Sequence, residues 1–124
     1  MLVDFEYRED VVVLRLRGRF DTGRDTGYLR SKADELKESG YTKVLADMNH
    51  VEYVDSTGIG FLIALYTGVL RSPNGRFALA NLHRRVREVL ELTRLSEILP
   101  IFPDEESALA ALKADQKLSA SQTS

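Results

Sequence analysis

Cysteine is absent from this 124-residue sequence, which excludes disulfide bonds and thiolate chemistry but does not report a redox compartment. Long apolar runs are missing too: no stretch reaches the roughly 18 consecutive apolar residues that a membrane-spanning helix needs. The opening residues, MLVDFE, contain no basic segment followed by a long apolar core, so no secretory signal is expected. These absences together predict a cytoplasmic protein that is not inserted into a membrane.

A strong excess of either charge is also lacking. The 17 basic and 19 acidic residues give a net charge of -2, and the basic residues are scattered. A nucleic acid is therefore not expected as the main partner. With 44% hydrophobic and 29% charged residues, the chain fits a single globular domain. We place this domain at residues 1–114 and expect residues 115–124, which hold little apolar surface, to form a disordered tail.

Patterns typical of metal sites and catalytic centres are few. His50 and His83 are the only histidines, and they stand far apart in the sequence. Asp21, Asp47 and Asp55 could converge and hold a magnesium ion, since hard cations prefer carboxylates. The favoured interpretation is that Asp21 caps a helix and Asp47 ends a strand. Neither a nucleophilic triad nor a phosphate-cradling glycine loop is recognisable, so we expect no catalytic residues, no metal and no cofactor.

Hydrophobic periodicity predicts strands that alternate with amphipathic helices. Strands are predicted at residues 3–7, 11–17, 43–48, 76–80 and 98–102, with a tight turn at 8–10 and with Pro100 favouring an edge position for the last strand. Helices are predicted at residues 29–38, 57–70 and 83–93, and a fourth begins at residue 104. This order predicts an α/β fold with a mixed sheet of four to five strands, covered by about four helices mainly on one side.

The most informative motif joins the third strand to the second helix: Asp55-Ser56-Thr57-Gly58-Ile59-Gly60. A helix start carries unpaired amide donors and the positive end of the helix dipole, so it favours a side-chain oxygen or a phosphate. Ser56 is therefore either a phosphorylatable serine, or this start merely uses Asp55 or Ser56 as a helix cap, which is worth ~1 kcal/mol. Gly58 and Gly60 each cost roughly 1 kcal/mol against alanine in a helix. Close packing on a strand or access for a partner would explain them.

Several blocks of the sequence resemble a known family. They are Gly18-Arg19-Phe20-Asp21, Val44-Leu45-Ala46-Asp47, residues 51–60 and Val89-Leu90-Glu91-Leu92-Thr93. Over residues 3 to 113 or so, the chain resembles a STAS domain of the bacterial anti-sigma factor antagonist group. The resemblance implies a STAS-like fold and a small regulatory binder without a catalytic centre.

In similar proteins, the unphosphorylated form binds an anti-sigma factor serine kinase and frees a sigma factor. The kinase then phosphorylates a serine, which releases the antagonist, and a phosphatase resets the cycle. Carried over, the phosphoacceptor is Ser56, with Thr57 as a less favoured rival hydroxyl. The implied partner-binding residues are Asp21, Asp55, Ser56, Thr57, Gly58 and Gly60. We expect a monomer or weak dimer.

Two other functions stay open. The first is a structural STAS subunit, as in stressosomes or lipid-transport assemblies, in which Ser56 is not modified. The second is a nucleotide-binding or hydrolytic domain that uses Asp55 and Ser56.

The sequence also departs from the family pattern. Arg94 stands where similar proteins usually have glycine, and a left-handed arginine there would cost about 1 kcal/mol or more. Asn49-His50 and Pro73-Asn74-Gly75 replace the usual small residues in two loops. A basic cluster of Arg84, Arg85 and Arg87 on the third helix could meet an acidic partner or a phosphate, although a solvated face is the favoured interpretation.

Overall fold

The computed structural model describes residues 2–19 and 26–113 of the chain. Within these ranges a five-stranded sheet forms the centre, with its strands in the order β1-β2-β3-β4-β5. The strands are β1 (Leu2–Arg8), β2 (Val11–Arg17), β3 (Lys43–His50), β4 (Arg76–Ala80) and β5 (Ile101–Phe102). The β1 and β2 strands are antiparallel, and β2, β3, β4 and β5 run parallel to one another. Asp21 and the predicted tail at residues 115–124 lie outside the described residues.

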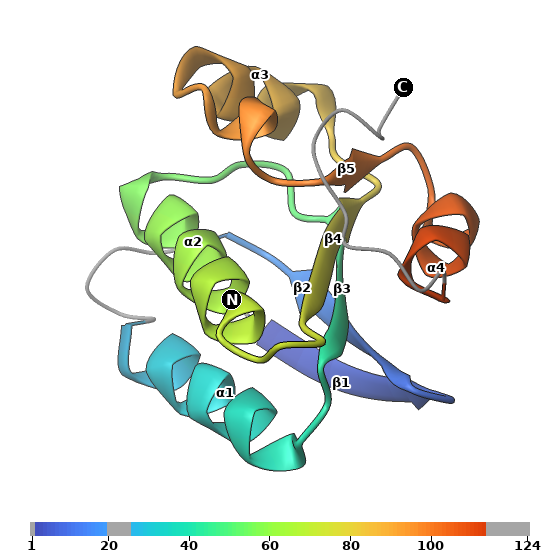
Figure 1. Ribbon diagram of the computed structural model, residues 1–124. Coiled ribbons are helices and arrows are strands. Elements are labelled where there is room, and N and C mark those ends of the chain that lie inside the picture. Colours follow the sequence, from blue (N-terminus) through green and yellow to red (C-terminus); the bar gives the residue numbers. More distant parts are fainter. Residues whose placement is uncertain (1, 20–25, 114–124) are drawn as a thin grey trace.

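Four α-helices cover the sheet: α1 (Thr26–Ser39), α2 (Ser56–Leu70), α3 (Arg84–Leu92) and α4 (Glu105–Lys113). The larger core lies between one face of the sheet and the first three helices, and it includes Leu14, Met48, Leu62 and Phe77. Figure 1 shows α1 and α2 on one side of the sheet and α4 on the other. The predicted α/β fold, with a mixed sheet covered mainly on one side, is confirmed.

The parallel strands are buried on both faces, as their apolar sequences predict. In β2, Val12, Leu14 and Leu16 belong to the larger core. Val11 and Val13 point the other way, into a smaller core with Ala108 and Leu112 of α4. Because side chains alternate along a strand, Arg15 falls on this second face, where α4 is the only covering helix among the described residues.

Several predicted boundaries need correction. The β3 strand extends to His50, and α1 already begins at Thr26. The strand predicted at residues 98–102 is shorter in the structure and spans only Ile101–Phe102. A 3₁₀ turn at Leu95–Glu97 is capped by Ile98, so Ile98 is not part of the strand. Its edge position, expected from Pro100, is confirmed.

Arg94 adopts the left-handed conformation that glycine would favour, with φ at 64°. Its guanidinium pairs with Glu97 at 3.2 Å, but both side chains are mostly exposed, so this ion pair offsets little of the backbone cost.

No helix in the described ranges is long and apolar enough to cross a membrane.

Candidate functional site at the start of α2

The motif residues follow the carboxyl end of β3, at the edge of the sheet where the neighbouring parallel strands β2 and β4 also end. Val51 and Val54 anchor the connection, since each is at most 1% exposed. The intervening residues Glu52 and Tyr53 face outward, and Tyr53 is 41% exposed. The buried valines therefore fix the backbone just ahead of Ser56 while leaving the surface around it open.

Asp55 is the helix cap. Its backbone is extended, and its carboxylate Oδ1 accepts hydrogen bonds from the amides of Thr57 at 2.9 Å and Gly58 at 3.1 Å. These are two of the donors that a helix start leaves unpaired. The question that the sequence left open between Asp55 and Ser56 is thereby answered for the cap: Asp55 fills that role.

Ser56 is the first residue of α2, and it is exposed. Its hydroxyl is not engaged in capping the helix, because Asp55 already accepts from the adjacent amides. Thr57, the rival hydroxyl, is only partly exposed. The Ser56 side chain therefore lies exposed at the start of the helix, where a modifying enzyme can reach it.

The two glycines of the motif differ in surroundings. Gly58 is buried, which fits close packing on the sheet. Gly60 is exposed, and a Cβ added to it would meet nothing within 4 Å. The protein's own packing therefore does not require a glycine at position 60, and access for a partner becomes the better explanation there.

The outward surface of α2 is free of charge along its whole length, because Ser56–Leu70 contains no charged residue. Its exposed positions continue from Ser56 through Gly60, Ile63, Ala64, Thr67 and Gly68. In a chain with 29% charged residues, an uncharged exposed helix face is typical of a surface that contacts another protein.

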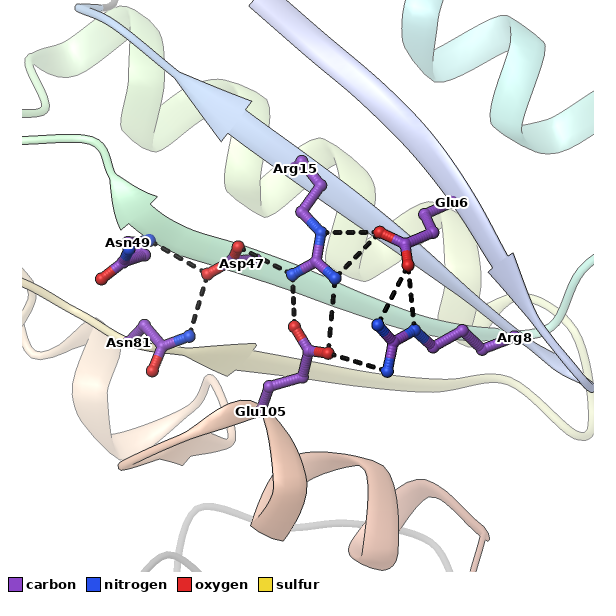
Figure 2. A network of polar contacts seen from close by, with 7 residues as sticks. All are labelled: Glu6, Arg8, Arg15, Asp47, Asn49, Asn81 and Glu105. Carbon is purple, nitrogen blue, oxygen red and sulfur yellow. Dashed lines mark hydrogen bonds and ion pairs between the residues drawn. The ribbon is translucent and has the colours of Figure 1, made fainter.

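Asp47 does not join Asp55. It lies on the α4 face of the sheet, is 5% exposed, and accepts hydrogen bonds from Arg15, Asn81 and the amide of Asn49 at 2.9 to 3.1 Å (Figure 2). Burial opposes its ionisation, but the hydrogen bonds from Asn81 and Arg15 prevail and hold the pKa of Asp47 below its ordinary value. The structure does not support a magnesium site formed by three aspartates, because the Asp47 carboxylate already accepts hydrogen bonds from Arg15, Asn81 and Asn49.

Arg15 connects Asp47 to two further carboxylates in the network of Figure 2. Its guanidinium donates to Glu6 at 2.9 Å and also to Glu105 at the start of α4. Arg8 pairs with the same two glutamates, at 3.0 and 3.2 Å. Hydrogen bonds from Arg15 and Arg8 lower the pKa of Glu6. The sequence analysis missed this network, although a charged residue at an inward position of β2 was its signal.

The histidines do not form a metal site. His83 precedes α3 and its Nε2 lies 2.5 Å from the carbonyl oxygen of Asn49, which requires Nε2 to carry the donating proton. His50 is exposed at the end of β3. Across residues 2–19 and 26–113, no group of three or more His, Asp or Glu side chains is placed to hold a metal ion.

Comparison with known proteins identifies the family. The model of the STAS domain matches residues 3–108. The chain belongs to the STAS domain family. A Thermotoga neapolitana protein, whose name assigns it provisionally to the anti-sigma factor antagonists, is 32% identical over 107 residues, which are 85% of this chain and 94% of the relative. The anti-sigma F factor antagonist of Paenibacillus polymyxa is 23% identical over 112 residues, or 90% of this chain and 94% of that protein.

Solved structures carry the same STAS fold. An anti-sigma factor antagonist from Mycobacterium paratuberculosis matches with a TM-score of 0.82 at 21% identity, over 91% of this chain and 94% of that one. The Bacillus cell-fate determinant SpoIIAA, in its phosphorylated form, matches with a TM-score of 0.67 at 22% identity, over 90% and 100% of the two chains. At these identities the likeness establishes the fold.

Proposed function

We propose that this STAS domain is an anti-sigma factor antagonist that is switched by phosphorylation of Ser56. In the unphosphorylated form it binds an anti-sigma factor serine kinase and so releases a sigma factor. Phosphorylation ends this binding, and a phosphatase restores it. The observation that carries the proposal is the exposed Ser56 hydroxyl at the first position of α2, left available because Asp55 caps the helix. The names of the sequence relatives support the choice of partner.

The local chemistry explains how a phosphate would act. Phosphorylation adds about -1.5 to -2 charge at neutral pH. The amides of Thr57 and Gly58 already bind Asp55, so they are not free to receive the phosphate, and the Asp55 carboxylate repels it. The dianion therefore projects toward solvent and leaves the fold of this protein nearly unchanged.

A partner packed on this surface experiences a larger effect. The uncharged face of α2 offers no cation to balance a dianion, so the phosphate must either be desolvated at the interface or keep the partner away. Such a penalty can reach several kcal/mol, and every 1.4 kcal/mol changes the binding constant about tenfold. The switch thus acts through the interface.

The same surface gives Gly60 a role. With no Cβ at this position, the backbone of a partner can approach α2 closely one helical turn beyond Ser56. The proposed contact surface therefore comprises Asp55, Ser56, Thr57 and Gly60 at the helix start, while Gly58 supports the helix from beneath. Asp21, the remaining residue implied by the family resemblance, stays a sequence-based prediction.

The direct test is phosphorylation by an anti-sigma factor kinase encoded in the same genome. The purified protein, incubated with this kinase and ATP, is expected to gain one phosphate by intact-mass measurement. Ser56→Ala should abolish the gain, and Thr57→Val should retain it. If the wild type gains no phosphate, or if Ser56→Ala still does, the proposal is wrong. Stable binding without any phosphorylation would instead favour a structural STAS subunit.

A further inference from the structure

A hollow of about 300 Å³ lies beside the segment that leads into α2, and its lining within residues 2–19 and 26–113 is formed by Arg19, Glu52, Tyr53 and Arg85. These residues belong to three segments, each of which follows the carboxyl end of a parallel strand. Arg19 follows β2, Glu52 and Tyr53 follow β3, and Arg85 lies in the first turn of α3, which follows β4. Figure 1 shows α3 next to the segment that joins β3 to α2. The hollow therefore shares one end of the molecule with Ser56.

Two features prepare this hollow for an anion. The Arg19 guanidinium lies 5.9 Å from the centre of the exposed Tyr53 ring, an arrangement that holds the cation in place. Among the described residues, neither Arg19 nor Arg85 takes part in an ion pair, whereas the adjacent Arg84 pairs with Glu88 at 3.1 Å. Among the lining residues that the structure describes, two arginines outnumber a single glutamate, which gives this part of the lining one excess positive charge.

The geometry points to this hollow as the docking site for an acidic side chain of the protein that binds at Ser56. The inference rests on the proposed function and adds a contact to it. Together with tryptophan, arginine and tyrosine are enriched among the residues that dominate binding energy at protein interfaces. A partner that covers Ser56 also reaches Tyr53, which precedes it by three residues. A carboxylate supplied by that partner would balance the excess charge of Arg19 and Arg85.

This contact also deepens the account of the switch. A phosphate on Ser56 adds negative charge to the same end of the molecule at which the partner's carboxylate would bind. The two anions repel each other. Phosphorylation would then weaken the docking contact in addition to obstructing the uncharged face of α2.

The test compares charge reversals at two places on the protein. Arg85→Glu reverses the charge in the hollow, and Arg71→Glu makes the same change at the far end of α2, about 22 Å along the helix from Ser56. Each full-length variant is titrated with the anti-sigma factor kinase at low and at high salt, and its thermal unfolding is recorded to verify folding. A third variant, Arg85→Lys, keeps the charge.

We expect Arg85→Glu to weaken binding about tenfold or more at low salt and to reduce the salt dependence of Kd, because a charge pair is replaced by a repulsion. Arg71→Glu should bind like wild type within about twofold, and Arg85→Lys should keep most of the salt dependence. Equal Kd values for Arg85→Glu and Arg71→Glu, with normal phosphorylation of Ser56, would overturn this inference and leave the proposed function intact. Failure of the wild type to bind would overturn both.

Discussion

Replacing Asp55 by alanine should destabilise the protein without removing its phosphoacceptor. A single carboxylate oxygen accepts the amides of Thr57 and Gly58, at 2.9 and 3.1 Å. Both bonds are lost in Asp55→Ala. Gly58 is buried, so water replaces its lost partner poorly, and the cost belongs in the upper half of the range for helix caps. We expect a loss of about 1.5 kcal/mol in the free energy of unfolding.

Two further variants make this prediction specific. Asp55→Asn retains a side-chain oxygen and should stay within about 0.5 kcal/mol of wild type. Ser56→Ala removes a hydroxyl that does not cap the helix, so its stability should also remain close to wild type. Urea unfolding followed by circular dichroism measures all three. In a thermal scan, the Asp55→Ala midpoint should fall by about 6 °C for a domain of this size. The assignment of the cap would be refuted if Asp55→Ala matched Asp55→Asn, or if Ser56→Ala were as unstable as Asp55→Ala.

Three other substitutions test separate parts of the fold and site. The folded protein lowers the pKa of Asp47. The ionised carboxylate therefore stabilises the fold fully above the ordinary aspartate pKa of about 3.9, and this contribution is lost as the pH falls below that value. Asp47→Asn should reduce stability at neutral pH, and in acid unfolding titrations its stability should decline less steeply than that of wild type. Gly60→Ala should raise the free energy of unfolding by about 1 kcal/mol, since the added Cβ meets no atom within 4 Å, yet weaken kinase binding in a calorimetric titration; unchanged affinity would argue against close approach there. Arg94→Gly should stabilise the protein by about 1 kcal/mol in denaturant unfolding, because glycine adopts the left-handed backbone conformation without the strain that arginine has there. A loss of stability would mean that the exposed ion pair between Arg94 and Glu97 contributes more than such pairs usually do.

The sequence was sufficient for the sheet and the helices because their apolar residues recur at the spacing of the elements they form. The valine run of β2 and the three-and-four spacing of α2 each match one period clearly. The strand predicted at residues 98–102 failed for a local reason. Leu95–Glu97 closes a 3₁₀ turn after the left-handed Arg94, so the chain reaches the sheet only at Ile101.

The sequence located the helix start at Asp55 and Ser56, but it did not show which of the two residues caps the helix. Asp55 and Ser56 are both common cap residues, and the choice between them depends on where the first helical turn begins, which only the backbone shows. The hollow at Arg19, Tyr53 and Arg85 lies between three segments that are distant in sequence. No local sequence pattern predicts that such distant residues lie close together. The same holds for Arg15 and Glu105, which stand 90 positions apart.

The ion pairs between the first hairpin and α4 set an order for folding during synthesis. Val11 and Val13 leave the ribosome well before Ala108 and Leu112, which form their apolar cover in α4. The carboxylate of Glu105 that meets Arg15 arrives with the same helix. Until α4 emerges, one side of the nascent sheet exposes its apolar side chains, and Arg15 on that side lacks the carboxylate of Glu105. The α4 helix supplies both the apolar cover and this carboxylate in one step, so this side of the domain closes only after α4 has been synthesised.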